Sequence, residues 1–403
     1  MARLPYRVRV SFFRARRIAR IGAALTVAAF SFAALSGCVN HDPIARRWPD
    51  GQPGSTGTAG LSGAQIAPPD NLRGEFAGAG ASSIEAAMAA WIAQFQSYSA
   101  TISISYDPSG SGAGREIFLA GGVLFAGSDI PLSTDEVQRS LAVCGPQGAV
   151  DIPIYVSPIA VAFNLPGVDS LNLTAQNMAL IFSGQISRWN DSRLTADNPG
   201  VSLPDVAVTP VHRTDNSGTT TNFTEYLHAV APDAWPWAPA GTWPLEGGDS
   251  AQGTAGVISV VDQTLGAVTY VDASQVGNLG TAALQVGSDW VSVSAQGAAI
   301  AVDNSPFVSG RHELDLAIEI DRNTEVAGAY PLILVSYAVA CLHYDNVMDG
   351  EFVQSFLSFI VSDAGQQVAQ QTSGSAPLSA DMAGRVNATL SSITTGPVEG
   401  SQG

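Results

Sequence analysis

Lysine is absent from this 403-residue sequence, so all 18 of its basic side chains are arginines. Acidic residues are missing from the N-terminal end, where none precedes Asp42, and seven of the arginines stand within the first 20 residues. Without residues 1–37, 11 arginines face 35 acidic residues, a net charge of −24. A surface of this sign repels nucleic acid, so we expect no nucleic-acid partner.

Several sequence signatures of enzymes are also missing. No Gly-x-Ser-x-Gly turn for a nucleophilic serine is present, and none of the five histidines is marked as a base. The G-x-G-x-x-G dinucleotide pattern fails because Arg115 stands where its last glycine belongs. No cluster of His, Cys and Asp has the spacing of metal ligands, so we predict no metal site. These absences make an enzyme the weaker hypothesis.

The N-terminal arginines have a specific explanation. The basic stretch ends at Arg20, and 15 mostly apolar residues follow, Ile21–Leu35, which suit the core of a signal peptide. The next residues, Ser36-Gly37-Cys38, complete a sequence that resembles a bacterial lipobox. We therefore predict that residues 1–37 are removed and that the thiol of Cys38 carries a diacylglycerol. Palmitate is an expected fatty acid of this lipid anchor. The alternative is an ordinary signal peptide with an incidental cysteine.

Cysteine is scarce, with three residues in all, and two remain beyond the lipobox, Cys144 and Cys341. An even pair in an exported protein favours a disulfide. Two separate buried thiols are the alternative.

The length exceeds what one core usually covers, so two domains are expected. Residues 38–73 are rich in Pro, Gly, Ser and Thr and predict a flexible tether. From residue 74, strands, loops and helices alternate, which predicts an α/β fold. Ser82 and Ser83 stand where the N-caps of a helix belong. The last residues, 391–403, are expected to be a disordered tail.

Three Gly/Ser-rich loops, around Ser82, Ser111 and Ser217, each precede a predicted helix. The first turn of a helix leaves backbone N–H groups unpaired and carries about half a positive charge. Three such ends directed at one place would form an anion site. Each loop taken singly is more often a plain turn.

The order of these motifs is similar to that of a known family. The segments GAGASS, GSGAGREIF, FAGSDIPLS, IFSGQISRWND, VHRTDNSGTTTNFTEYL and GAVTYVDAS, with DAGQQVAQQTSGSAPL near the end, resemble the phosphate-binding lipoproteins of bacterial high-affinity phosphate ABC transporters. The resemblance implies a class II periplasmic-type binding fold, a monomer with two lobes joined by a hinge, each a mixed sheet flanked by helices. It places lobe 1 at residues 74–152 and 289–390, and lobe 2 at residues 153–288.

The resemblance also implies a ligand, inorganic phosphate, and a set of residues that bind it. No cofactor is implied, and the partners are the permease subunits of the transporter and the membrane that holds the lipid anchor on its extracytoplasmic face. Asp215 is expected to orient the arginine of the set, and Ser83 to use only its backbone N–H. The implied phosphate ligands are Ser82, Ser83, Ser111, Asp129, Arg213, Ser217, Gly218 and Thr219.

Asp129 is the unusual member of that set, because an ionised carboxylate only accepts hydrogen bonds. Phosphate at neutral pH still carries a proton to donate, whereas sulfate has none. We therefore expect Asp129 to exclude sulfate. Two alternatives stay open, a phosphatase with Ser217 or Thr219 as nucleophile and a phosphate-sensing surface protein.

Overall fold

Two strands with every residue buried, β4 (Ala149–Phe163) and β11 (Ile333–Cys341), run through the centre of the fold. Both are continuous runs of mainly Val, Ile, Leu and Ala, the composition of strands that are covered on both faces. The computed structural model describes residues 67–397, all within the compact unit Leu61–Gly403. Cys38 and the predicted signal peptide lie outside the described residues.

A mixed sheet of 11 strands contains β4 and β11. Its strand order is β2 (Ile102–Asp107), β1 (Gly74–Gly80), β3 (Phe125–Ser128), β11, β4, β8 (Ala267–Asp272), β6 (Thr209–Arg213) and β7 (Asp249–Ala251), with β9 (Gly280–Val286), β5 (Ser170–Leu173) and β10 (Asp289–Val291) attached beside it. β4 changes partner along its length. Its residues 149–158 pair with β11, and its residues 159–163 pair with β8. One strand therefore carries the sheet from one group of elements to the other.

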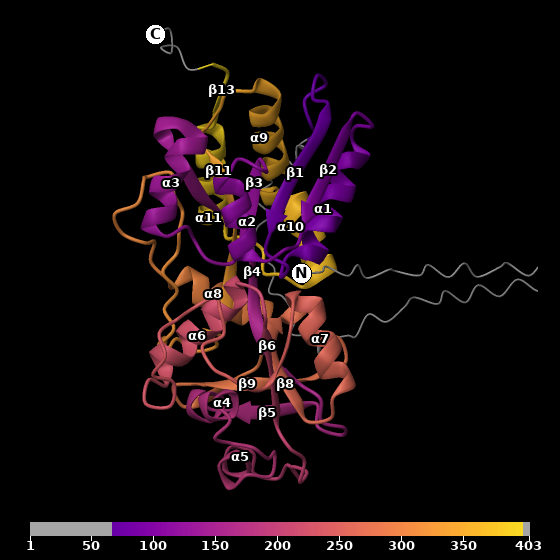
Figure 1. Cartoon of the computed structure of the whole chain (residues 1–403), viewed down its shortest axis with the longest axis vertical. Coiled ribbons are helices and arrows are strands. Elements are labelled where there is room, and N and C mark those ends of the chain that lie inside the picture. Colours follow the sequence, from indigo (N-terminus) through magenta and orange to yellow (C-terminus); the bar gives the residue numbers. More distant parts are fainter. Residues whose placement is uncertain (1–66, 398–403) are drawn as a thin grey trace, which may run out of the picture. The chain divides into compact units, whose positions relative to one another are not determined.

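The elements at the start of β4 form the first group, drawn in the upper part of Figure 1. Chain segments from both ends of the described sequence contribute to it. Its N-terminal members are β1 (Gly74–Gly80), α1 (Glu85–Ser97), β2 (Ile102–Asp107), α2 (Ser111–Leu119), β3 (Phe125–Ser128), α3 (Thr134–Cys144) and η1 (Gly145–Gln147). Its C-terminal members are β12 (His343–Tyr344), α9 (Val347–Val361), α10 (Asp363–Ser373), α11 (Ala380–Ser391) and β13 (Thr394–Thr395).

The second group lies at the other end of β4, in the lower part of Figure 1, and comes from one continuous stretch. Between the two groups, α8 (Ala295–Asp303) packs on β4. The members of the second group are β5 (Ser170–Leu173), α4 (Ala175–Phe182), α5 (Ser192–Asp197), β6 (Thr209–Arg213), α6 (Gly218–Val230), β7 (Asp249–Ala251), α7 (Gly253–Gln263), β8 (Ala267–Asp272), η2 (Ala273–Gln275), β9 (Gly280–Val286) and β10 (Asp289–Val291).

Strand direction determines which ends of the two groups face each other. β1, β2 and β3 are parallel, β11 is antiparallel to β3, and β4 is antiparallel to β11. β8 is antiparallel to β4, and β6 and β7 are parallel to β8. The strands β1–β3 and β6–β7 therefore run in opposite directions. Their carboxyl ends, where ligand sites of α/β sheets form, point toward the same middle zone.

Three expectations about the chain's segments need correction. The tether was predicted to extend through residue 73, but Leu72 is 1 % exposed and belongs to the hydrophobic core. The tail predicted to be disordered from residue 391 contains β13, which pairs with β12 through main-chain hydrogen bonds. The lobe boundary at 288/289 separates β9 from β10, although these strands pair. Local composition did not reveal these three tertiary contacts.

Cys144, the last residue of α3, and Cys341, the last residue of β11, form a disulfide, as predicted from their number and the export signal. Their Cα atoms are 5.1 Å apart and 197 positions separate them in the sequence. Among residues 67–397, no helix is long and apolar enough to cross a membrane.

Candidate functional site

The Ser82–Ser83 loop follows β1 and supplies two buried hydroxyls. Ser82 Oγ lies 3.1 Å from Thr254 Oγ1 and accepts a hydrogen bond from Thr254 N at 3.3 Å. Ser83 Oγ donates to Asp129 Oδ1 at 2.7 Å. The prediction that these serines cap the helix is wrong, because the N-cap of α1 is Ile84 and no side chain caps it. Both hydroxyls instead bind partners that are distant in sequence.

α2 begins at the second predicted loop with Ser111, which is 1 % exposed. Its Oγ accepts a hydrogen bond from Asp129 N at 3.2 Å. Gly110, just before it, has φ of 98°, and a Cβ there would lie 2.5 Å from Asp215 Oδ2. Both the left-handed backbone and the close approach require glycine. The N-terminus of α2 therefore lies directly against the Asp215 loop of the second group.

Asp129 follows β3 and is 3 % exposed. Oδ1 accepts from Ser83 Oγ and Ser336 Oγ, each at 2.7 Å, and Oδ2 accepts from Thr219 Oγ1 at 3.2 Å. Burial raises the pKa of the Asp129 carboxyl above its ordinary value, and the three hydroxyls and the charge of Arg213 oppose that rise. A carboxylate offers about four lone-pair positions. Three are occupied, so Oδ2 keeps the capacity to accept one more donor.

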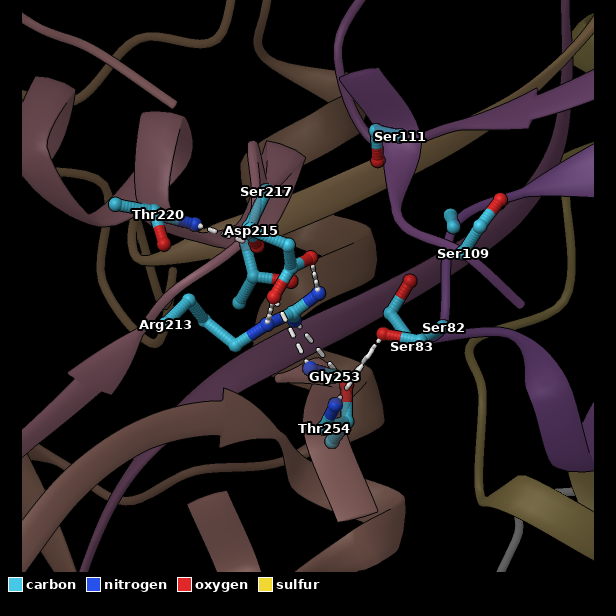
Figure 2. Close-up of polar contacts among 12 residues, drawn as sticks. Ser82, Ser83, Ser109, Ser111, Arg213, Asp215, Ser217, Thr220, Gly253 and Thr254 are labelled. Atoms are coloured by element: carbon cyan, nitrogen blue, oxygen red, sulfur yellow. Dashed lines mark hydrogen bonds and ion pairs between the residues drawn. The ribbon is translucent and has the colours of Figure 1, made fainter. Parts of the chain in front are cut away.

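Arg213, the last residue of β6, is 3 % exposed and forms a two-point ion pair with Asp215. Nε donates to Oδ1 at 2.8 Å, and Nη2 donates to Oδ2. Burial acts to raise the pKa of Asp215, but the hydrogen bonds and charge of Arg213 outweigh it, so the pKa is lowered. Figure 2 shows the guanidinium in contact with Asp215 and Thr254, and Thr254 in turn in contact with Ser82. The expected contact between Asp215 and Arg213 is therefore present, and the orienting role of Asp215 stays a prediction.

The loop after Asp215 leads into α6. Ser217 is its N-cap and accepts a hydrogen bond from Thr220 N at 3.2 Å. Gly218 and Thr219 form the first turn, and a Cβ on Gly218 would lie 2.6 Å from Ser111 Oγ. The first turn of α6 therefore packs against the start of α2, and only a residue without a side chain fits at Gly218. All eight predicted ligand residues lie in this one zone.

Sequence reasoning missed three residues of the same zone. Thr254 lies in the first turn of α7, and its Oγ1 lies 3.5 Å from Arg213 Nη1. The preceding residue, Gly253, donates its N–H to Asp215 Oδ1 at 3.0 Å. Ser336 on β11 and Asn222 on α6 both bind Asp129. The SAQGTAG segment before α7 is a further Gly/Ser loop entering a helix, so the pattern itself could have indicated Thr254.

The zone does not have the arrangement of a serine nucleophile. Ser217 Oγ accepts from the backbone of its own helix. His212, the nearest histidine in sequence, bonds to the carbonyl of Arg213 at 3.1 Å and stacks on Trp243 with 5.1 Å between ring centroids. Among the described residues, no group of three or more His, Cys, Asp or Glu could hold a metal ion.

Comparison with known proteins defines first a class and then a family. A family model described as a PBP superfamily domain matches residues 65–364, most of the chain. The sequence is 29% identical to the phosphate-binding protein PstS 2 of Mycobacterium tuberculosis over 384 residues, 94% of this chain and 100% of that protein. It is 30% identical to PstS3 of Mycobacterium bovis over 359 residues, 87% of this chain and 92% of that one. The chain belongs to the PstS family of phosphate-binding proteins.

Solved structures support the fold. A high affinity periplasmic phosphate-binding protein (PfluDING) bound with phosphate matches with a TM-score of 0.65 at 20% identity, covering 78% of this chain and 93% of that one. A phosphate-binding protein from Stenotrophomonas maltophilia matches with a TM-score of 0.58 at 21% identity and the same coverage. The expected two-lobed periplasmic-binding-protein fold is confirmed. Membership of a family of binding proteins also agrees with the expectation that the chain is not an enzyme.

Proposed function

We propose that this protein captures inorganic phosphate between its two groups of elements and delivers it to the permease of an ABC transporter. The observation that carries the proposal is the meeting, in one buried zone, of a paired arginine, three helix N-termini and several hydroxyls. A buried oxyanion needs a partner for every oxygen, because an unpaired buried charge is very costly. Arg213 supplies a charge, and the starts of α2, α6 and α7 supply neutral donors without a large net charge.

Asp129 gives the proposed site its selectivity. Its three hydroxyl partners leave one lone-pair position on Oδ2, which a protonated phosphate oxygen can fill. Sulfate would present only lone pairs to the same atom. Two buried acceptors that face each other with no hydrogen between them cost several kcal/mol, which corresponds to roughly a thousandfold in affinity.

Capture requires a route for the ligand, and the sheet suggests it. Within residues 67–397, the chain crosses between the two groups only along β4 and along the segment that contains α8 and β11. Bending there would open the zone between the groups. We place one lobe at residues 72–152 and from after β10 to β13, in place of the predicted 74–152 and 289–390, with the other lobe between them. Family membership and the strand pairing support this division.

We also propose that the mature protein is a monomer anchored by a lipid on Cys38 at the extracytoplasmic face of the cell membrane. The disulfide supports an oxidising compartment outside the cytoplasm. Mass spectrometry of the intact protein from a bacterial host would test the anchor, since lipidation adds a diacylglycerol to Cys38 and a signal peptidase then removes residues 1–37.

Calorimetry on residues 39–403 tests the ligand and its selectivity together. Phosphate should bind in a large excess of sulfate, and Asp129→Asn should narrow the difference between the two anions, because an amide can donate to sulfate. Failure of the wild-type protein to bind phosphate would refute the function. Equal binding of sulfate by the wild type would refute the role of Asp129 alone.

A further inference from the structure

Asn222 joins the two sides of the site through main-chain atoms. It lies on α6, three residues after Thr219, and is 2 % exposed. Its Nδ2 donates to Asp129 O at 2.7 Å and to Gly218 O at 3.0 Å. Both amide hydrogens are therefore used, one toward the segment after β3 in the first group and one toward the first turn of α6.

Arg322 fixes the orientation of that amide. Its Nη2 donates to Asn222 Oδ1, and a guanidinium has no acceptor, so the amide NH2 group cannot face it. The reversed amide would also turn its oxygen toward the carbonyls of Asp129 and Gly218. Each of the three contacts thus requires the same orientation, and a rotation of the side chain would break all of them.

Arg322 is itself held from two elements. Nη1 donates to Pro331 O at 3.0 Å and to Ile333 O at 2.9 Å, and Nη2 forms an ion pair with Glu225 Oε2 at 2.9 Å. Arg322 is 5 % exposed, and burial lowers its pKa. Ile333 begins β11, the strand that also carries Ser336. The one cation therefore connects α6 to the strand that supports the Asp129 carboxylate.

We propose that Asn222 and Arg322 are positioning residues that hold the Asp129 main chain against the N-terminus of α6 and so stabilise the closed arrangement of the site. The proposal rests on the proposed phosphate binding for its effect on ligand affinity. Separation of the two groups would break the bond from Asn222 to Asp129 O, which re-forms on closure. Removal of that bond therefore speeds ligand release and loosens the acceptor that excludes sulfate.

Asn222→Ala tests the proposal against a matched control, Asn198→Ala. Asn198 is 4 % exposed, and its Nδ2 also donates to two carbonyls, of Asn172 and Leu194, each at 2.9 Å, but inside the second group. Stopped-flow fluorescence should show phosphate leaving Asn222→Ala roughly tenfold faster, the effect of about one lost hydrogen bond to a buried carbonyl. The ratio of phosphate to sulfate affinity should fall in the same variant. Asn198→Ala should keep both values while losing similar thermal stability.

Arg322→Lys gives a second variant, because it keeps the charge and loses the planar fork that serves several acceptors at once. It should show part of the change in release rate and in selectivity. Release rates within twofold of wild type in both Asn222→Ala and Arg322→Lys would overturn the proposal.

A measurement without ligand separates this proposal from the proposed function. Amide hydrogen exchange in the segment 125–132 of the ligand-free protein should rise in Asn222→Ala and stay unchanged in Asn198→Ala. If the wild type bound no phosphate, the function would fail, and the exchange result would still decide the positioning role. Unchanged exchange in Asn222→Ala would count against that role whatever the protein binds.

Discussion

Arg213 and Asp129 are the two central charges of the site, and their surroundings differ. Both are 3 % exposed, but Arg213 has a full counter-charge in Asp215, whereas Asp129 is bonded only by neutral hydroxyls. A paired cation attracts an anion weakly at long range and binds it through geometry. A carboxylate without a paired cation instead binds an incoming oxygen only if that oxygen carries a proton to donate. Under the proposed function, this contrast predicts that phosphate affinity depends mainly on the second group and selectivity mainly on the first.

Among the substitutions that test this contrast, Arg213→Ala should cause the largest loss of phosphate affinity. The variant removes the only described cation that is directed into the zone from β6, and it leaves Asp215 as an unpaired carboxylate beside the ligand. Loss of one partner of a buried pair costs about 3–5 kcal/mol, so phosphate affinity should fall several hundredfold or more. Calorimetry measures the loss. An unchanged dissociation constant would place the ligand elsewhere.

Asp215→Asn should have a smaller effect, because it keeps the cation and removes its orientation. The amide can accept one hydrogen bond through its oxygen, but its NH2 group would face an arginine nitrogen. We expect roughly tenfold weaker phosphate binding, the cost of one imperfect charge-assisted contact. A gain in affinity would instead show that Asp215 acts mainly as an opposing charge, and titration at two salt concentrations would reveal that electrostatic origin.

The pH dependence of sulfate binding should show the smallest effect and concerns Asp129 alone. Burial raises the pKa of this carboxyl, so it gains a proton at a higher pH than an exposed aspartate does. Once protonated, it can donate to a sulfate oxygen. Sulfate affinity should therefore increase as the pH falls through that pKa, by at most about tenfold per pH unit. Asp129→Asn should bind sulfate without this dependence, and a flat wild-type profile would contradict the assignment.

Much of the site could be predicted from local sequence, because its parts are loops that enter helices. The GSGAGREIF segment indicates a helix start, and α2 does begin at Ser111. The short spacing in HRTD allows Arg213 and Asp215 to pair, and they do so. Those features depend on residues that are near in sequence. The disulfide could also be predicted without the structure, because an even pair of cysteines and an export signal favour a bond.

What the sequence could not predict depends on contacts between distant segments. Ser336 lies 207 positions from its partner Asp129. It is a single serine in a buried apolar strand, and nothing nearby in the sequence marks it as part of a site. Ser82 and Ser83 resembled N-caps because local spacing allowed it, but tertiary partners took both hydroxyls. Asn222 similarly stands on a helix face where nothing nearby marks it. Identification of such residues requires the strand order and the direction of each helix.

The disulfide has a consequence for the connectivity of the molecule as a whole. In the sequence, every element of the second group lies between Cys144 and Cys341. The disulfide therefore joins the two ends of the chain segment that contains this group. A protease that cuts the second group once leaves a single molecule of unchanged mass, apart from one added water. Two fragments appear only after reduction. The protein would thus keep both groups of elements attached after a first cut.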